Sequence, residues 1–245
     1  MRCLNLKRVF SFFLSSMLTF GMVSSPCSAF DAPTHEYVTK RGIDILDDIL
    51  GGDFSDFYTE EDRKLIFIYC VKPDMDENDG AYKYHFYNPA TEKNFMGEDD
   101  SALTRCINHF NAAVHYLEIG KRAKSMEELG RSLHFLGDLN TPVHTNNQSL
   151  LDTGFNFFFH VSFEDTCKNI QDRVRSSLQK GELRYYKVNT VENIAKWCAH
   201  LADDGLYALY EKILPKPQVA ENAVKNAQKA IAGLLYKFYL IVINR

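Results

Sequence analysis

Apolar residues recur at helical spacing along nearly the whole chain, and this pattern constrains the fold more than any other feature of the sequence. In residues 35–50, for example, Val38, Leu46 and Ile49 fall on one helical face, and Thr34 stands where an N-cap is expected. Convincing runs of alternating apolar and polar residues, which would predict strands, do not occur. The sequence therefore predicts an all-α fold, built as a single compact multi-helix domain.

Further helices are expected in the segments that share this spacing, namely 60–70, 101–124, 125–139, 157–179, 191–214 and 219–243. The capping-box pattern Ser125-x-x-Glu128 predicts where one of them begins. Residues 71–101 lack the helical pattern but contain five aromatic residues, which argue against disorder. Because loops this long in compact domains are usually functional or disordered, we expect a structured and functional loop there.

The first 29 residues have the features of a secretory signal peptide. Arg2, Lys7 and Arg8 precede an apolar stretch, and small residues lead up to an expected cut after Ala29. The apolar stretch is too short and too rich in serine for a membrane span. We therefore expect the segment 1–29 to be removed, leaving a catalytic domain of residues 30–245. The mature chain is expected to be secreted or periplasmic, monomeric and without a transmembrane span.

The charge balance argues against one broad class of function. Removal of residues 1–29 takes away three of the 28 basic residues and none of the 32 acidic ones, which leaves a formal charge of −7. A negative total argues against broad electrostatic binding to nucleic acid or to anionic membranes, although a local patch could still bind either.

Four cysteines remain after the expected cut: Cys70, Cys106, Cys167 and Cys198. Export makes two disulfides plausible, with three possible pairings, and four buried free thiols are an equal alternative. Since no two of these cysteines lie at the spacing of a ligand pair, the sequence argues against a cysteine-rich zinc site.

Residues 134–144, HFLGDLNTPVH, place three candidate metal ligands close together. His134 and Asp138 are four residues apart and share one helical face, so both can reach one cation. Pro142 is expected to end the helix, so that His144 can turn back towards them. A second pair with the same spacing, His160 and Glu164, follows along the chain. Either pair alone is also typical of a structural hydrogen bond.

Two further histidines strengthen the prediction of a metal site. His35 lies at the entrance to the first helix, and His85 lies in the 71–101 loop after the acidic run PDMDEND. Nitrogen and carboxylate ligands without thiolates suit zinc, and catalytic zinc sites keep a position open for water. The other histidines, His109, His115 and His200, lack such neighbours and are interpreted as structural or surface residues.

The run SLHFLGDLNTPVH, followed by GF…FHxxFE, resembles the zinc-dependent bacterial phospholipase C family, which includes the catalytic domain of clostridial alpha-toxin. The same fold is shared by the single-strand-specific zinc nucleases of fungi and plants. The core of the resemblance is H-x₃-D-x₅-H followed by H-x₃-E. His35 and the P-D…H-F-Y pattern support it in the right order, and it spans the chain from Phe30 to the last helix.

The resemblance implies three zinc ions. The implied ligand groups are His144, His160 and Glu164 for one ion; Asp74, His85, His134 and Asp138 for another; and Asp138 as a bridge, His35, and the amino group and carbonyl of Phe30 for the third. Family members usually begin with tryptophan, so Phe30 departs from the pattern, although the ligand atoms come from its backbone. Asp74 is preferred to Asp76 because it directly follows Pro73.

The implied reaction is hydrolysis of the glycerol-side phosphate ester of phospholipids such as phosphatidylcholine at a membrane surface, giving diacylglycerol and a phosphorylated headgroup. In this reading Asp74 orients or deprotonates the attacking water, and Asp138 bridges two metals. The alternatives are a zinc-dependent single-strand nuclease or 3′-nucleotidase, and a protein that keeps metal only for stability. The run GDLNTPVH is closer to the phospholipase form than to the nuclease form, which commonly has HQPLH.

Overall fold

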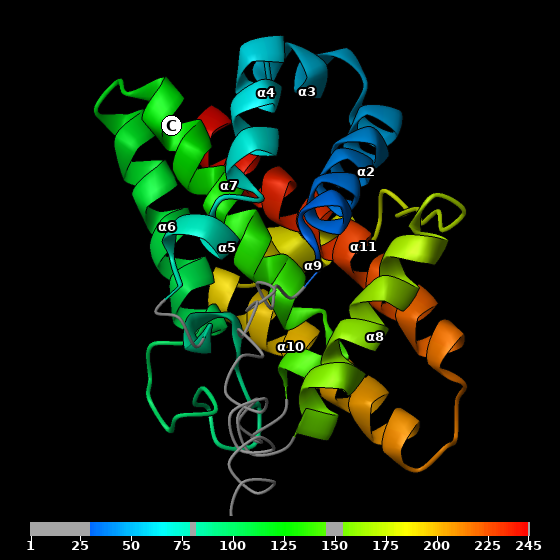
Figure 1. Cartoon of the computed structure of the whole chain (residues 1–245). Coiled ribbons are helices and arrows are strands. Elements are labelled where there is room, and N and C mark those ends of the chain that lie inside the picture. The colour runs from blue at the N-terminus through cyan, green and yellow to red at the C-terminus, as the bar shows by residue number, and fades with distance from the viewer. Residues whose placement is uncertain (1–29, 79–81, 146–153, 245) are drawn as a thin grey trace, which may run out of the picture.

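The structure is a computed structural model that describes residues 30–78, 82–145 and 154–244, so the expected signal peptide lies outside the described residues. In these ranges the regular elements are all helical (Figure 1). They are α2 Ala32–Leu50, α3 Gly52–Phe57, α4 Glu60–Tyr69, α5 Pro73–Asp76, η1 Lys83–His85, α6 Ala102–Glu118, α7 Arg122–Leu139, η2 Pro142–His144, α8 Gly154–Gln171, α9 Leu183–Val188, α10 Val191–Tyr210 and α11 Lys216–Ile243. The all-α prediction is confirmed.

Helix α7 lies at the centre of the fold (Figure 1). It packs against α6 on one side and against α4 on another, and its second half is buried without interruption from Ser132 to Leu139. A helix buried on every face can contribute polar side chains only if these find partners inside the protein. His134 and Asp138 are such side chains.

Close packing of α7 against α4 depends on Gly130. A Cβ at this position would lie 2.8 Å from the carbonyl oxygen of Ile66 and 2.9 Å from Cβ of Tyr69. The absence of a side chain therefore lets the two helices approach until their backbones nearly touch. This approach brings the end of α4, and with it the carbonyl of Cys70, next to His134.

Two predicted helix starts are wrong. The N-cap of α2 is Asp31, whose carboxylate accepts hydrogen bonds from the Thr34 backbone N–H at 3.2 Å and the Thr34 hydroxyl at 2.7 Å. Helix α7 begins at Arg122, ahead of Ser125, and the buried Ser125 hydroxyl donates to the carbonyl of Ala113 at 2.6 Å. In both cases the hydroxyl residue expected at the N-cap lies within the first turns of the helix. Its hydroxyl donates a hydrogen bond there instead of accepting one from the helix backbone.

The 71–101 segment is structured over its described residues, as expected, but it contains the short helices α5 and η1. The Tyr87 N–H donates to the carbonyl of His144 at 3.0 Å, which ties this segment to η2. Helices α3 and α9 were not predicted, because six residues are too few to show a helical period.

The four cysteines of the expected mature chain are buried free thiols, so the disulfide alternative is not formed. Burial raises the pKa of Cys70, Cys106 and Cys198 to about 12, which keeps them protonated at neutral pH.

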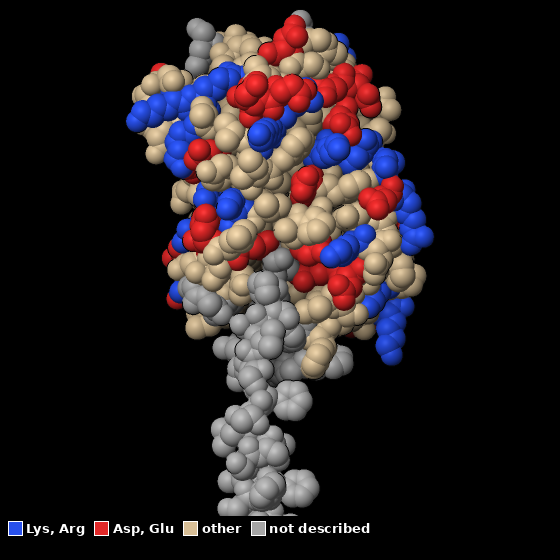
Figure 2. Space-filling model, turned by 45° about the horizontal axis from the view of Figure 1, so that its top comes forward, with Lys and Arg blue, Asp and Glu red and all other residues tan. Residues whose placement is uncertain are grey.

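The molecular surface agrees with the charge argument from the sequence. On the face shown in Figure 2, acidic and basic side chains are interspersed, and no broad basic area covers it. Among the described residues, no helix combines the length and the apolar character that crossing a membrane requires.

Candidate metal centre

The predicted ligands come from six separate elements and meet beneath the surface. His35 is on α2, Asp74 on α5, His85 on η1 and His144 on η2, while α7 and α8 carry two ligands each, and none of these residues is more than 7% exposed. Phe30, directly before α2, is fully buried. So many buried nitrogens and carboxylates in one place would be costly without a cation to bind them.

Four of the ligands form a compact central group. His85 Nδ1 lies 2.9 Å from Asp138 Oδ2, 3.1 Å from His134 Nε2 and 3.7 Å from Asp74 Oδ1. His134 Nε2 lies 3.5 Å from both Asp74 Oδ1 and Asp138 Oδ2. Ligand atoms placed 2.0–2.1 Å from a tetrahedral zinc ion are about 3.3 Å from one another. The five distances, 2.9–3.7 Å, are close to the separation expected for two ligands of one zinc ion, and His85, His134 and Asp138 form one possible ligand group.

The tautomer of His134 directs the lone pair of Nε2 towards the other ligands of this group. Its Nδ1 lies 2.9 Å from the carbonyl oxygen of Cys70, and because a carbonyl only accepts, Nδ1 carries the proton. Burial, together with the neighbouring His35, lowers the pKa of His134 well below its ordinary value, so the ring is neutral and Nε2 is unprotonated. A metal-binding histidine that donates its other N–H to a backbone carbonyl is the usual arrangement in zinc sites.

Asp138 has a different neighbour at each carboxylate oxygen. While Oδ2 faces His85 and His134, Oδ1 lies 3.3 Å from His35 Nε2. Burial would raise the pKa of Asp138, but the adjacent rings of His134, His85 and His35 lower it well below its usual range, so it is an ionised carboxylate. Such a carboxylate can hold one cation on each oxygen.

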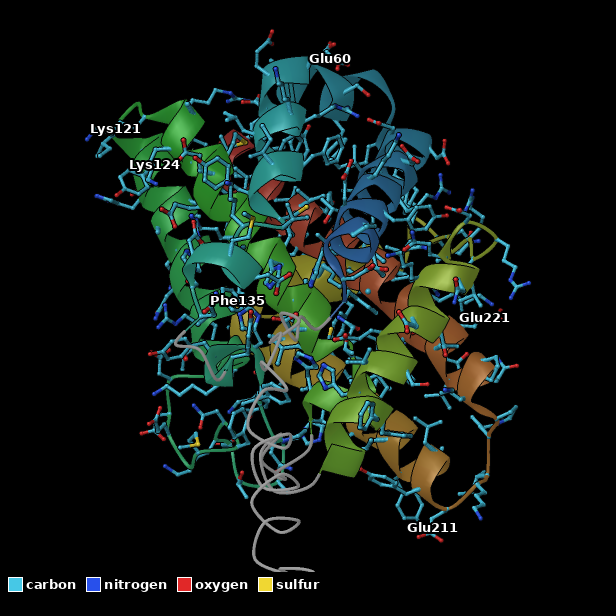
Figure 3. The ribbon with its side chains drawn as sticks, in the orientation of Figure 1. Glu60, Lys121, Lys124, Phe135, Glu211 and Glu221 are labelled. Carbon is cyan, nitrogen blue, oxygen red and sulfur yellow. The ribbon has the colours of Figure 1, made fainter. Side chains whose placement is uncertain are left out.

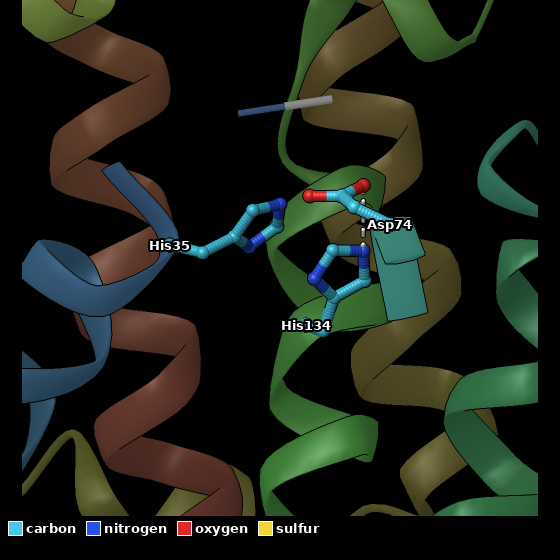
Figure 4. A group of neighbouring side chains, drawn as sticks. All are labelled: His35, Asp74 and His134. Carbon is cyan, nitrogen blue, oxygen red and sulfur yellow. Dashed lines mark ion pairs between the residues drawn. The ribbon is translucent and has the colours of Figure 1, made fainter. Parts of the chain in front are cut away.

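His35 completes this side of the site (Figure 4). Its ring stacks on His134 with centroids 3.9 Å apart, and His35, Asp74 and His134 also form a possible ligand group of their own. Within the described residues, neither ring nitrogen of His35 has a hydrogen-bond partner. A Cβ on Gly137 would come within 2.9 Å of the His35 ring, so the glycine makes room for it.

The second group of ligands is formed by His144, His160 and Glu164. His144 Nδ1 donates to the carbonyl of His85 at 2.6 Å, which leaves Nε2 as a lone pair facing His160 Nε2 at 3.2 Å. Glu164 Oε1 is 2.7 Å from His160 Nε2 and 4.0 Å from His144 Nε2. Burial lowers the pKa of His144 well below its usual value and raises that of Glu164 to about 7. His85 therefore links the two groups, through its ring and its carbonyl.

These observations fit zinc as the resident ion. The donors are imidazole nitrogens and carboxylate oxygens without a thiolate, and both ring nitrogens of His35 and Oδ1 of Asp138 are buried without a hydrogen-bond partner among the described residues. The supporting Cys70 and His85 carbonyls were missed from the sequence, because backbone atoms leave no residue signal. The partners of His109, which are Glu77 and Glu128, were also missed.

Comparison with known proteins decides the family. The family described as zinc dependent phospholipase C matches residues 34–211 of this chain. The chain belongs to the zinc-dependent phospholipase C family. The zinc dependence of this family agrees with the ligand groups found in the structure.

The relatives are distant but cover most of the chain. Phospholipase C of Paraclostridium bifermentans is 24% identical over 248 residues, which include 86% of this chain and 59% of the relative. Phospholipase C of Bacillus cereus is 24% identical over 166 residues, or 65% of this chain and 57% of the relative. The structure of alpha toxin from Clostridium absonum superposes with a TM-score of 0.72 at 24% identity, covering 86% of this chain and 64% of the toxin. The likeness to the toxin concerns the fold, and this chain spans less than two thirds of the length of each relative.

Proposed function

We propose that this chain is a secreted phospholipase C with three zinc ions, which hydrolyses the glycerol-side phosphate ester of phospholipids to diacylglycerol and a phosphorylated headgroup. The observation that carries the proposal is the central group of Asp74, His85, His134 and Asp138, in which five pairs of donor atoms lie 2.9–3.7 Å apart, close to the separation of two ligands on one zinc ion. Family membership supports the reaction class.

The proposed ligand sets are those implied by the sequence. His144, His160 and Glu164 would hold one ion, and the central group a second. The third would be held by His35, the second oxygen of Asp138, and the backbone amine and carbonyl of Phe30 once residues 1–29 have been removed. The position of Phe30 supports its assignment, because its side chain is fully buried with the ring 5.7 Å from that of His35.

Bound zinc would polarise the phosphate oxygens and lower the pKa of water from about 15.7 towards about 7. The chain itself would orient the reactants. Asp74 is one of the two most exposed ligands, so it is placed to meet a water that enters the site. Because Oδ1 is the oxygen nearest His85 and His134, Oδ2 is proposed to accept the proton of that water.

The attacking water oxygen would form the new P–O bond while the bond between phosphorus and the glycerol oxygen breaks. The diacylglycerol oxygen then takes up a proton, which balances the reaction. Asp138, buried and ionised between three histidines, would stay unprotonated and hold the two sides of the site at a fixed spacing.

Parallel assays test this proposal. Zinc-loaded protein should release phosphocholine from phosphatidylcholine vesicles, should leave single-stranded DNA intact, and should lose the lipid activity when the metal is chelated. Cleavage of DNA without lipid hydrolysis would replace the proposal by the zinc nuclease alternative. Tight zinc binding with neither activity would indicate that the metal serves stability alone.

A further inference from the structure

A charged cluster outside the ligand groups connects α5 to α6 and α7. We call it the Glu77 cluster; its members are Glu77 directly after α5, Arg105 and His109 on α6, and Glu128 and Arg131 on α7. Glu77 Oε2 lies 2.9 Å from His109 Nε2 and 3.2 Å from Arg105 Nη1, and its Oε1 lies 2.5 Å from Arg131 Nη1. The carboxylate of Glu77 thus meets three cationic side chains from two helices.

His109 is an imidazolium in this arrangement. Its Nδ1 lies 2.7 Å from Glu128 Oε2, and its Nε2 faces Glu77. Ionised carboxylates only accept hydrogen bonds, so both ring nitrogens must donate. Lys124 and Arg131 from α7, and Arg105 from α6, supply the remaining charges around these carboxylates. The side chains of Glu77 and Glu128 are only 13% exposed, so solvent screens their ion pairs less than it screens pairs at the open surface.

The cluster holds the element that carries Asp74. Helix α5 has only four residues, and its N-cap Lys72 makes no side-chain cap hydrogen bond. A helix so short has no stability of its own, so tertiary contacts must place it. The Glu77 N–H closes α5 by donating to the Pro73 carbonyl at 2.9 Å, and Asp76 is paired with both Nη atoms of Arg131 at 2.7 Å.

The cluster also contacts the ring that packs beside the ligand histidines. The His109 ring stacks on Phe135 with centroids 5.7 Å apart and planes at 4°. The Phe135 ring also packs against two ligands: its centroid lies 5.3 Å from that of His85 and 5.2 Å from that of His134 (Phe135 is labelled in Figure 3). The Glu77 cluster therefore adjoins the central ligand group both through α5 and through Phe135.

We infer that Glu77 is a positioning residue: held by His109, Arg105 and Arg131, it fixes α5 so that the Asp74 carboxylate faces His85 and His134. Glu77 belongs to none of the possible ligand groups and acts through Asp74. The inference rests on the proposed metal assignment. It adds to that assignment an explanation of how Asp74, which lies on a four-residue helix, is held beside the ligands from α7.

The test is a zinc titration of metal-free protein against a competing chelator, comparing wild type with Glu77→Gln. The variant keeps the shape of the side chain but removes the charge that three cations bind. Each zinc ion that binds gives one step in the titration. The step that Asp74→Asn weakens is called the Asp74 step, and the step that Glu164→Gln weakens is called the Glu164 step. We expect Glu77→Gln to weaken the Asp74 step about tenfold to hundredfold and to leave the Glu164 step unchanged.

Glu221→Gln is the matched control, because it breaks an ion pair with Lys225 on α11, away from the ligands (Glu221 is labelled in Figure 3). It should leave every binding step at the wild-type value. If Glu77→Gln does not yield folded protein, His109→Gln serves instead, since it removes one of the three cations and keeps a neutral donor. The inference is overturned if the Asp74 step stays within about twofold of wild type, or if all steps weaken equally, as a general structural defect would cause.

Phosphatidylcholine hydrolysis separates this inference from the proposed function. Wild-type protein that binds zinc but hydrolyses no lipid would refute the proposed function, while the zinc titration would still decide the role of Glu77. If lipid is hydrolysed, Glu77→Gln should lower kcat more than it raises KM, because Asp74 is proposed to act on water rather than on the bound lipid.

Discussion

Asp138 lies between three of the other ligands of the site. His35 approaches one carboxylate oxygen, and His85 and His134 approach the other. Its spacing from His134 was predicted from the sequence, since residues four apart share a helical face. The approach of His35 and His85 was expected only through the family resemblance, because both come from segments far away in the chain.

The orientation of the ring nitrogens could not be predicted from the sequence. His134 and His144 each direct Nε2 inwards because Nδ1 donates to a backbone carbonyl, of Cys70 and His85 respectively. Those carbonyls are positioned by the ends of α4 and η1. Residue types and spacing therefore indicated the ligands, whereas their tautomers follow from tertiary structure.

At the residue scale, Gly137→Ala should displace His35. The added Cβ would lie 2.9 Å from the His35 ring, closer than carbon atoms pack, so the ring must shift from its present position beside Asp138. We expect the His35 zinc step to weaken about tenfold to hundredfold. Gly181→Ala is the control, since nothing lies within 4 Å of the Cβ it adds. Equal zinc affinities for the two variants would show that His35 is not a ligand.

The proposed role of the Phe30 amine gives a second prediction at this scale. An amine with a reference pKa of about 7.7–8.0 can bind metal as its neutral form, whereas a peptide nitrogen cannot. A mature chain that carries two extra residues before Phe30 should therefore bind one zinc ion fewer and lose at least about tenfold in lipid hydrolysis. Mass spectrometry of the intact N-terminus must accompany the assay. Full activity of a verified extended chain would refute the assignment.

At the scale of elements, long helices were predictable and short ones were not. Segments such as 191–214 have enough residues to show a helical period, and α10 and α11 occur where expected. Helix α5 has only four residues and is placed by the Glu77 cluster, so no local pattern indicates it. The element that carries Asp74 is therefore the part of the site whose placement the sequence could least predict.

The Glu77 cluster has two opposite effects on stability as the pH changes. Burial alone would lower the pKa of His109, but its hydrogen bonds to Glu128 and Glu77 raise it above 6.5. His109 therefore stabilises the fold fully below pH 6.5 and loses this contribution as pH rises through its folded pKa. Burial would raise the pKa of Glu77, but His109 and Arg131 lower it from 4.5 to about 2. The contribution of Glu77 is thus complete above pH 4.5 and is lost as pH falls towards 2.

Chemical denaturation of metal-free protein can measure the effect of His109. The free energy of unfolding of wild type should exceed that of His109→Asn by about 1–2 kcal/mol at about pH 6, and by less at about pH 9. Because both proteins carry the same zinc ligands, the titration of those ligands cancels in the difference. A difference that does not change with pH would contradict the imidazolium assignment.

At the scale of the whole molecule, the ligand groups join elements that are far apart in the chain. His35 comes from the first described helix, and His160 and Glu164 come from α8, so bound ions would cross-link segments distant in sequence. An ion at a thousand times its dissociation constant stabilises the folded state by about 4 kcal/mol. In a domain of this size that shifts Tm by about 8–16 °C.

Chelation should therefore lower Tm of the zinc-loaded protein by about 10 °C or more, and added zinc should restore it. Differential scanning calorimetry with and without the chelator measures this, and magnesium in place of zinc is the control. An unchanged Tm after verified removal of the metal would mean that the ligand groups do not hold the fold together.

The most direct test of the central proposal is product analysis of phosphatidylcholine hydrolysis by zinc-loaded protein in water labelled with heavy oxygen. Attack of water at phosphorus, with loss of the glycerol oxygen, predicts unlabelled diacylglycerol and phosphocholine that carries the label on its phosphate. Formation of phosphatidic acid, or label in the diacylglycerol, would contradict the proposed bond cleavage. Absence of any lipid product from protein with its zinc ions bound would contradict the proposed function itself.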